Sequence, residues 1–198
     1  RLQNCFSRHD TMNILITGGA GFIGSHLAEK LLAQGERVTV IDDLSTGSLN
    51  NIRHLHKRRN FVFKKGSVLN EKQLVPLVEK ADKIFHLAAA VGVKYIIEKP
   101  LYSMANNILG TENVLRLAAK RNTPVLITSS SEVYGKLDRF PFREDADRLY
   151  GSAFNERWGY GLSKAVDEFM ALGYYREKGL PTVVARLFNT VGPRQTGR

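Results

Sequence analysis

The sequence predicts an α/β fold in which helices cover both faces of a doubly wound parallel sheet. From Met12 onward, short runs rich in β-branched and aromatic residues alternate with longer stretches of helical pattern. This alternation is the order expected of repeated strand–helix–strand units. A glycine-rich segment, TGGAGFIG at 17–24, directly follows the first strand-like run and opens the first helical stretch.

The elements follow from this rhythm in chain order. We expect strands at 13–17, 37–41, 61–65, 83–86, 125–128 and 182–187. We expect helices between them at 22–34, 71–80, 103–121 and 160–178. Six strands in this rhythm indicate a Rossmann-type domain. Residues 1–11 carry no such pattern, so we interpret them as an extension outside the core of a domain that runs over 12–198.

Composition narrows the class of protein. The 198 residues are 43% hydrophobic and 24% charged, which excludes disordered, collagen-like and low-complexity chains. The uncharged apolar run at 84–93 is much shorter than the ~20 residues of a membrane-spanning helix, so we expect no membrane partner. The single cysteine, Cys5, excludes an internal disulfide and a cysteine-based zinc cluster. We therefore expect no metal and a reducing, cytoplasmic setting.

Charge raises the question of an anionic partner, because 29 basic residues outnumber 19 acidic ones and give a net charge of +10. The excess is concentrated in one short stretch, at Arg53, Lys57, Arg58, Arg59, Lys64 and Lys65. That stretch lacks the regularly interleaved aromatic residues of a base-stacking surface. We interpret it as a solvated basic surface and expect no nucleic-acid partner.

The glycine-rich segment is the sharpest local motif. Gly18, Gly21 and Gly24 are spaced by three residues, which suits a tight turn, close approach to a pyrophosphate, and close packing of helix on strand. The amides and positive dipole end of the helix would face the phosphates. The next strand ends at Asp42, whose carboxylate can accept hydrogen bonds from the adenosine ribose. Because that charge repels a 2′-phosphate, the sequence favours NAD over NADP as cofactor.

Two further groups suggest chemistry. Tyr160 and Lys164 are four residues apart on one predicted helix, so the ammonium could stabilise a phenolate and lower the tyrosine pKa toward working pH. Just past the fifth predicted strand, Ser130 and Ser131 offer hydroxyls and Glu132 a carboxylate. This is the edge where open α/β sheets bind ligands. Taken alone, the first group is typical of a solvated helix face and the second of a turn.

Together with HLAA at 86–89 and RLFNTVGPR at 186–194, these motifs make the chain resemble the extended short-chain dehydrogenase/reductases that modify nucleotide sugars. The resemblance covers 12–198. It implies that Tyr160 is the base, that Lys164 is its partner and a ribose ligand, and that Ser130 binds the reacting sugar oxygen. It implies that Asn189 and Arg194 lie near the substrate phosphates.

The same resemblance implies the composition of the NAD cleft. Besides Tyr160 and Lys164, the expected cofactor residues are Gly18, Gly21, Phe22, Ile23, Gly24, Asp42, Asp43, Ser45, Thr46, Gly47, Ser67, Val68, Leu87, Ala88, Ala89, Asn107 and Thr128. Ser67 departs from the family pattern, which often has an aspartate at the adenine, so that contact stays open.

The resemblance also suggests a reaction. Its shared first step oxidises C4 of the sugar to a 4-keto intermediate. Related dehydratases carry an Asp-Glu pair where this chain has Ser131 and Glu132, and typical 4-epimerases lack a carboxylate at the second position. A Ser-Glu pair is most similar to UDP-glucuronate decarboxylases, as is RWGYGLSK at 157–164. We therefore favour a decarboxylase over a UDP-sugar 4-epimerase or a 4,6-dehydratase.

Three further expectations complete the sequence-based hypothesis. Relatives continue for about a hundred residues or more, so we expect most of a C-terminal substrate lobe to lie outside these 198 residues. The family is commonly dimeric through a pair of helices, for which 103–121 and 160–178 are the candidates. A module that binds NAD without catalysis is the alternative from a different functional class.

Overall fold

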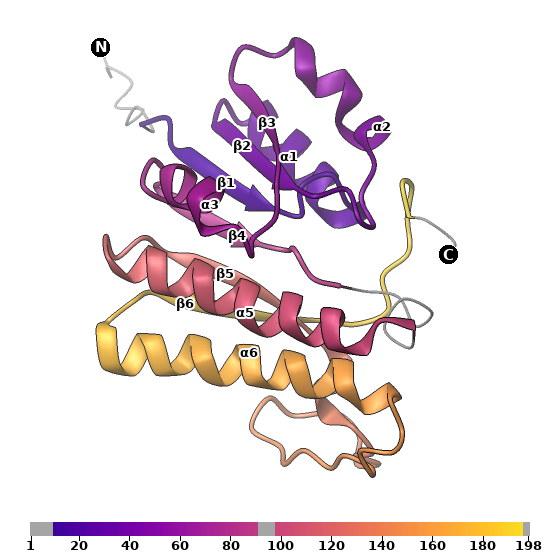
Figure 1. The fold of residues 1–198 in the computed structure, drawn as a ribbon. Coiled ribbons are helices and arrows are strands. Elements are labelled where there is room, and N and C mark those ends of the chain that lie inside the picture. The colour runs from indigo at the N-terminus through magenta and orange to yellow at the C-terminus, as the bar shows by residue number, and fades with distance from the viewer. Residues whose placement is uncertain (1–9, 91–97, 196–198) are drawn as a thin grey trace, which may run out of the picture.

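The computed structural model describes residues 10–90 and 98–195 and contains one parallel sheet of six strands. The strands are β1 (Asn13–Thr17), β2 (Arg37–Asp42), β3 (Phe61–Lys65), β4 (Lys83–His86), β5 (Val125–Ser130) and β6 (Thr182–Leu187). Their spatial order is β3-β2-β1-β4-β5-β6. The predicted α/β fold with a doubly wound sheet is therefore confirmed (Figure 1).

The helices form layers on the two faces of this sheet. They are α1 (Phe22–Ala33), α2 (Leu49–Ile52), η1 (Arg53–Lys57), α3 (Glu71–Val78), α5 (Pro100–Ala119), η2 (Ser131–Tyr134) and α6 (Arg157–Lys178). One buried cluster joins the sheet to α3, α5 and α6, and a second joins it to α1, α2 and η1. Figure 1 shows α5 and α6 running side by side.

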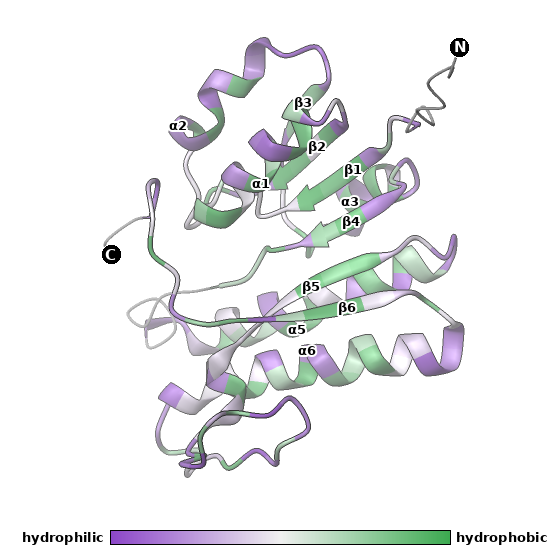
Figure 2. Ribbon diagram, turned by 180° about the vertical axis from the view of Figure 1, so that it is seen from behind, coloured by the Kyte–Doolittle hydropathy of each residue, from purple (hydrophilic) through white to green (hydrophobic). Residues whose placement is uncertain are grey.

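Alternation along the strands explains both clusters. In β1, Leu15 packs toward α3 and α5, while Ile14 and Ile16 pack toward α1. Because successive side chains point to opposite faces, a strand covered on both sides reads as a continuous apolar run. Apolar colouring accordingly follows the strands in Figure 2. β6 is the exception, since α6 packs against one of its faces while Val183 on the other is 57% exposed.

Several predicted boundaries need correction. β2 and β5 extend to Asp42 and Ser130, because the parallel ladder continues to Lys65 and Leu187 on the neighbouring strands. The helix predicted at 160–178 begins at Arg157, so Tyr160 lies inside its first turn. The sequence did not predict α2, η1 or η2, which are too short to show a helical period. Residues 1–9 of the predicted extension, and Cys5 with them, lie outside the described residues.

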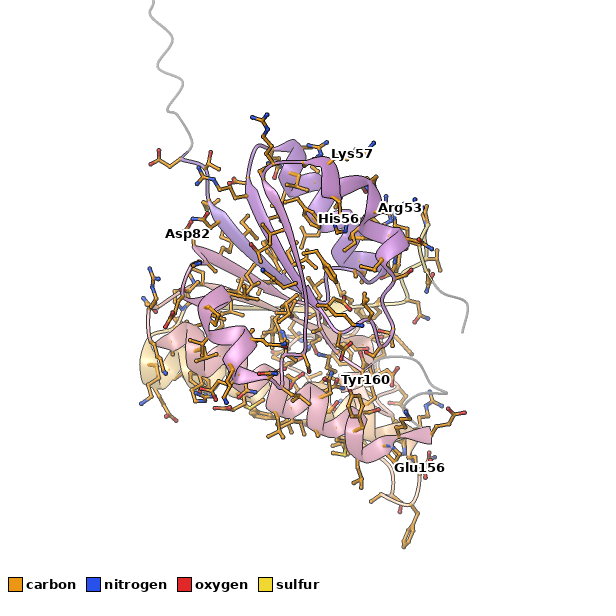
Figure 3. The ribbon with its side chains drawn as sticks, turned by 45° about the horizontal axis from the view of Figure 1, so that its top comes forward. Arg53, His56, Lys57, Asp82, Glu156 and Tyr160 are labelled. Carbon is orange, nitrogen blue, oxygen red and sulfur yellow. The ribbon has the colours of Figure 1, made fainter. Side chains whose placement is uncertain are left out.

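The basic cluster lies on and after η1. Arg53 and Lys57 belong to η1, Lys64 and Lys65 to β3, and their side chains are exposed. In Figure 3 Arg53 and Lys57 lie at one edge of the molecule, away from Tyr160. This position agrees with the interpretation of a solvated surface.

Candidate active site

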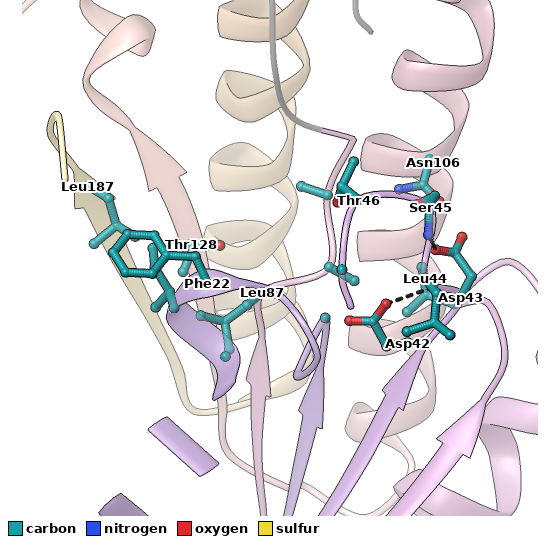
Figure 4. A pocket seen from close by; sticks show the side chains of 18 of the residues that line it. Phe22, Asp42, Asp43, Leu44, Ser45, Thr46, Leu87, Asn106, Thr128 and Leu187 are labelled. Atoms are coloured by element: carbon teal, nitrogen blue, oxygen red, sulfur yellow. Dashed lines mark hydrogen bonds between the residues drawn. The ribbon is translucent and has the colours of Figure 1, made fainter. Parts of the chain in front are cut away.

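A cavity of about 990 Å³ lies at the carboxyl ends of the central strands. It sits beside β1 and β4, where the strand order reverses, and such switch points are where open α/β sheets bind ligands. Figure 4 shows Phe22, Leu87 and Thr128 gathered at one end and Asp42, Leu44 and Thr46 at the other.

Most of the sequence-predicted residues line this cavity. They are Gly18, Gly21, Phe22, Ile23, Gly24, Asp42, Asp43, Ser45, Thr46, Gly47, Ser67, Val68, Leu87, Ala88, Ala89, Thr128, Ser130, Tyr160, Lys164 and Arg194. Four predicted residues do not line it: Asn107, Ser131, Glu132 and Asn189. Their roles, like those of the lining residues, remain predictions.

The glycine loop has a shape that only glycine permits. Gly18 has φ +71°, and a Cβ there would lie 2.7 Å from the backbone nitrogen of Ala88. A Cβ on Gly24 would lie 2.4 Å from the carbonyl oxygen of Gly18. Helix α1 begins behind this loop with no side-chain cap and no acidic residue in its first turn. Its first amides are therefore left for an anionic ligand in the cavity.

Asp42 anchors the loop at the other end of the cavity. Its Oδ2 accepts a hydrogen bond from the Ala20 amide at 2.9 Å, and its Oδ1 accepts one from the Leu44 amide at 2.8 Å. Burial raises the pKa of this carboxyl, and the two amides lower it. Each carboxylate oxygen keeps a further lone pair, so the two backbone bonds still leave acceptors for a ligand hydroxyl.

Tyr160 and Lys164 meet at the cavity floor, but the ammonium does not act as the sequence suggested. Burial, reinforced by the charges of Glu132 and Asp167, raises the pKa of Tyr160 to about 12, although the Ser130 hydroxyl lowers it. Lys164 is only 3% exposed, and its Nζ pairs with Asp167 Oδ2 at 3.1 Å. The Tyr160–Lys164 spacing predicted a lowered tyrosine pKa, whereas burial in this structure raises it.

Close backbone packing brings Ser130 to Tyr160. A Cβ on Gly161 would lie 2.7 Å from the Glu132 carbonyl oxygen, so glycine allows η2 to approach α6. The Tyr150 hydroxyl bridges the two elements by donating to the carbonyls of Val133 at 2.9 Å and Gly161 at 3.2 Å. At the start of η2, the Ser130 Oγ accepts a hydrogen bond from the Glu132 amide at 3.2 Å.

The residues outside the cavity have contacts of their own. Asn107 is buried; its Oδ1 accepts from the Ala90 amide at 2.7 Å and its Nδ2 donates to Ser163 Oγ at 3.1 Å. It therefore ties the segment after β4 to α6. Glu132 is exposed, although desolvation raises the pKa of its carboxyl. Asn189 is exposed in the segment after β6.

Arg194 is in the cavity wall but already has a partner. Its Nη1 lies 2.8 Å from Glu29 Oε2 and donates to Ser25 Oγ at 3.3 Å. This ion pair lowers the pKa of Glu29. The contacts fasten the segment after β6 to α1.

Sequence reasoning missed several lining residues. They are Ile41, Leu44, Ser48, Gly66, Glu98, Asn106, Ser129, Leu187, Phe188, Thr190 and Gln195. Ile41 and Leu187 end predicted strands, and extending the predicted strand ends by two residues would also have found Gly66, Ser129 and Phe188. The remaining lining residues are Leu44, Ser48, Glu98, Asn106, Thr190 and Gln195, which lie outside these extended strands.

A glycine loop, a strand-end aspartate and a helical Tyr-Lys pair around one switch-point cavity are the features of a dinucleotide-binding α/β domain. The sequence model of the family described as GDP-mannose 4,6 dehydratase matches residues 15–198. The chain belongs to this family, which is one of the extended short-chain dehydrogenase/reductase families of nucleotide-sugar epimerases and dehydratases.

Curated relatives and solved structures support this assignment. The chain is 44% identical to a UDP-N-acetyl-alpha-D-glucosaminuronate decarboxylase of Bacillus cytotoxicus, over 91% of the chain and 55% of that protein. It is 37% identical to UDP-glucuronic acid decarboxylase 1 of Xenopus tropicalis, over 95% of the chain and 43% of that protein. The chain thus spans about half the length of these relatives.

Among solved structures, a UDP-N-acetylglucosamine 4-epimerase from Methanobrevibacter ruminantium in complex with UDP-N-acetylmuramic acid superposes with a TM-score of 0.85 at 32% identity, over 94% of this chain and 57% of that one. A dTDP-glucose 4,6-dehydratase from Streptomyces venezuelae with NAD bound gives 0.85 at 31% identity, over 93% and 58%. Among the described helices of the present chain, none has the length and apolarity needed to cross a membrane.

Proposed function

We propose that this chain binds NAD and serves an enzyme that modifies a nucleotide sugar through a transient 4-keto intermediate, decarboxylating a UDP-linked uronic acid such as UDP-glucuronate. One observation carries the proposal. Tyr160, Lys164 and Ser130 open into the same cavity as the glycine loop and Asp42. A hydride acceptor and a proton acceptor can therefore face one sugar carbon.

The cavity fits NAD in shape and charge. The Gly18–Gly24 turn leaves no room for side chains where a pyrophosphate would approach, and the uncapped α1 offers its amides there. The partly exposed loop from Asp42 to Gly47 supplies acceptors for a ribose. Solved relatives with NAD bound support the same cofactor.

The proposed chemistry assigns each reacting atom a partner. The glycine loop, Asp42 and Lys164 would hold NAD, which would supply the hydride acceptor for C4, return the hydride to the decarboxylated ketone, and in its oxidised form add a positive charge that favours the Tyr160 phenolate. Tyr160 takes the proton of the C4 hydroxyl, and Ser130 holds that oxygen. Oxidation makes a C6 carboxylate part of a β-keto acid. The C5–C6 bond then breaks, carbon dioxide leaves, the electron pair enters the C4 carbonyl, and C5 gains a proton.

A second candidate is a UDP-sugar 4-epimerase. It is favoured by the fold neighbours named as epimerases, which match over more than nine tenths of the chain. The decarboxylase is preferred for two reasons. The two curated relatives given above are named as decarboxylases of UDP-linked uronic acids. In addition, Glu132 follows Ser131, which is the Ser-Glu pair that resembles UDP-glucuronate decarboxylases.

Calorimetry with NAD and NADP tests the cofactor assignment. NADP is expected to bind at least about tenfold more weakly, a difference of ~1.4 kcal/mol, because its 2′-phosphate would meet the Asp42 charge. Equal affinities would remove Asp42 from the ribose site. No binding of either dinucleotide would contradict the whole proposal.

Incubation with NAD and carboxyl-labelled UDP-glucuronate, or its 2-acetamido counterpart, tests the reaction. Release of labelled carbon dioxide supports the decarboxylase. Label retained in a C4-epimerised sugar supports the second candidate. NAD binding without conversion of either sugar supports a non-catalytic module.

We also propose that α5 and α6 form the interface of a homodimer. Both helices expose large apolar side chains, among them Leu101 and Leu109 on α5 and Phe169, Leu172 and Tyr175 on α6. Sedimentation equilibrium checks this, and a monomer at micromolar concentration would refute it.

A further inference from the structure

A chain of buried polar groups runs beneath the site from the edge of the cofactor cleft to Lys164. The Ala88 amide donates to Thr17 Oγ1 at 3.2 Å, and Thr17 Oγ1 lies 2.7 Å from His86 Nδ1. On the other side of the ring, His86 Nε2 lies 3.1 Å from Thr111 Oγ1. Thr17 immediately precedes Gly18, and Ala88 lines the cavity.

The chain ends at a buried carboxylate. Burial raises the pKa of the Asp167 carboxyl, while the Lys164 ammonium and the nearby Thr111 hydroxyl lower it. Asp167 is fully buried, and its Oδ2 holds the Lys164 ammonium at 3.1 Å. Its Oδ1 has no hydrogen-bond partner among the described residues, so a lone pair is open to the Thr111 proton. Lys164 is the residue whose ammonium must face Tyr160 and the cofactor.

Proton counting gives the chain one direction. Burial lowers the pKa of His86 to about 3, so the ring is neutral and has one N–H. The Ala88 amide can only donate, which leaves Thr17 free to donate its proton to His86 Nδ1. His86 then donates from Nε2 to Thr111, which leaves the Thr111 proton for the open lone pair of Asp167 Oδ1. The opposite tautomer would leave Thr17 without an acceptor and Asp167 without the Thr111 proton.

We propose that Asp167 is a positioning residue of the site, which fixes the Lys164 ammonium and is itself oriented by the directional chain Ala88–Thr17–His86–Thr111. The importance of Lys164 rests on the proposed function, whereas the chain itself can be tested without it. A carboxylate that holds the ammonium through Oδ2 and accepts the Thr111 proton at its open Oδ1 would be unable to shift without breaking a buried bond. The geometry thus couples the floor of the glycine loop to the Tyr-Lys pair.

Substitution of Asp167 gives a sharp spectroscopic signature. In Asp167→Asn, the single acceptor oxygen must face the Lys164 ammonium, so the amide nitrogen faces Thr111 and donates to it. Thr111 must then donate to His86 Nε2, and the ring proton moves to Nδ1. Long-range proton–nitrogen NMR of histidine-labelled protein near neutral pH distinguishes the two tautomers. We expect Nε2–H in the parent chain and Nδ1–H in Asp167→Asn.

A matched pair at Thr111 separates the hydrogen-bond chain from a simple loss of charge. In a Thr111→Ser background the hydroxyl remains, and Asp167→Asn should still switch the tautomer. In a Thr111→Val background the shape remains but the hydroxyl is gone, so Asp167→Asn should leave His86 unchanged. A switch in both backgrounds, or in neither, overturns the proposal. If Asp167→Asn fails to fold, two measurements on other variants still decide. An Nδ1–H ring in the parent chain would by itself refute the proposal. Loss of the Nε2–H signature in Thr111→Val but not in Thr111→Ser would support the proposal.

Titration with NAD links the chain to the site. His86 does not line the cavity, yet its ring signals should move as NAD binds, because Thr17, which precedes Gly18, joins the ring to the glycine loop. If backbone signals of Gly18 and Gly21 move while His86 stays still, the chain does not position the site. If no signal moves, NAD does not bind and the proposed function fails, while the tautomer experiment still decides on the chain.

Discussion

Replacing Gly24 by alanine separates the two roles that glycine plays in a helix. Alanine is favoured over glycine inside a helix by about 1 kcal/mol. At Gly24 this gain is opposed, because the new Cβ would lie 2.4 Å from Gly18 O and 2.7 Å from Gly19 Cα. Both neighbours are backbone atoms, so the glycine loop itself must move. Overpacking of this kind typically costs about 1–3 kcal/mol.

Gly173 in α6 is the matched control. It also lies inside a helix, but a Cβ there meets nothing within 4 Å. Gly173→Ala should therefore raise the free energy of unfolding by about 0.5–1 kcal/mol. We expect Gly24→Ala to be less stable than Gly173→Ala by roughly 2–4 kcal/mol, since the gain is lost in the first variant and the contact penalty added.

Urea and thermal unfolding measure this gap. For a domain of this size, 1 kcal/mol corresponds to a Tm shift of roughly 2–4 °C, so the two variants should differ by about 5–15 °C. NAD affinity should fall at least about tenfold in Gly24→Ala, since the displaced loop binds the pyrophosphate in the proposed site. Equal stabilisation of both variants would refute the close approach of α1 to the glycine loop.

Three further outcomes follow from the site. Tyr160→Phe should lower turnover by about 10²- to 10⁴-fold with NAD affinity nearly unchanged, because it removes the proton acceptor and little surface; a normal rate would place the base elsewhere. Glu132→Gln should slow carbon dioxide release more than it weakens NAD binding, as followed with labelled UDP-glucuronate, whereas an epimerase should be little affected. The free energy of unfolding should fall as the pH drops from about 6.5 toward 3, because the unfolded chain protonates His86 and the folded chain, with its pKa of about 3, does not. His86 can contribute at most about 1.4 kcal/mol of this change per pH unit. If NMR shows the His86 ring protonated above pH 5, roughly two units over its pKa of about 3, burial does not lower the His86 pKa in this way.

Local patterns sufficed for the strands and the glycine loop. The predicted bounds of β1, β3, β4 and β6 agree with the structure, because apolar runs between turn residues are set by local sequence and by burial on both faces. The carboxyl ends of parallel strands share one edge, which is why Asp42 and Ser130 could each be placed at the ligand-binding edge of the sheet from sequence alone. The sequence did not predict α2, because the start of this helix depends on a single side-chain cap. In that cap, Ser48 Oγ accepts a hydrogen bond from the Asn50 amide at 3.3 Å.

The electrostatics of the site could not be predicted in this way. The Tyr160–Lys164 spacing is local, whereas the partner of the ammonium is decided by which other side chains are buried beside it. Asp167 lies three residues further along α6, and its neighbour Thr111 comes from α5. A sequence pattern records the residue types but not their burial, and here burial sets the sign of the Tyr160 pKa shift.

Asp167 and Glu168 are adjacent and both buried, yet they contact different parts of the fold. The Glu168 carboxylate accepts from Arg186 Nη2 at 2.8 Å and contacts Arg148, which fastens α6 to β6 and to the segment after η2. Asp167, about 100° further round the helix, faces α5 and β4 and holds Lys164 instead. One turn of α6 thus carries a contact that locks the fold and a contact that sets the site. Glu168 pairs with two arginines, whereas Asp167 pairs with a single ammonium. Removing the charge of Asp167 therefore leaves only Lys164 without its counter-ion. The effects of such a substitution should be concentrated at the Tyr160 end of the cavity.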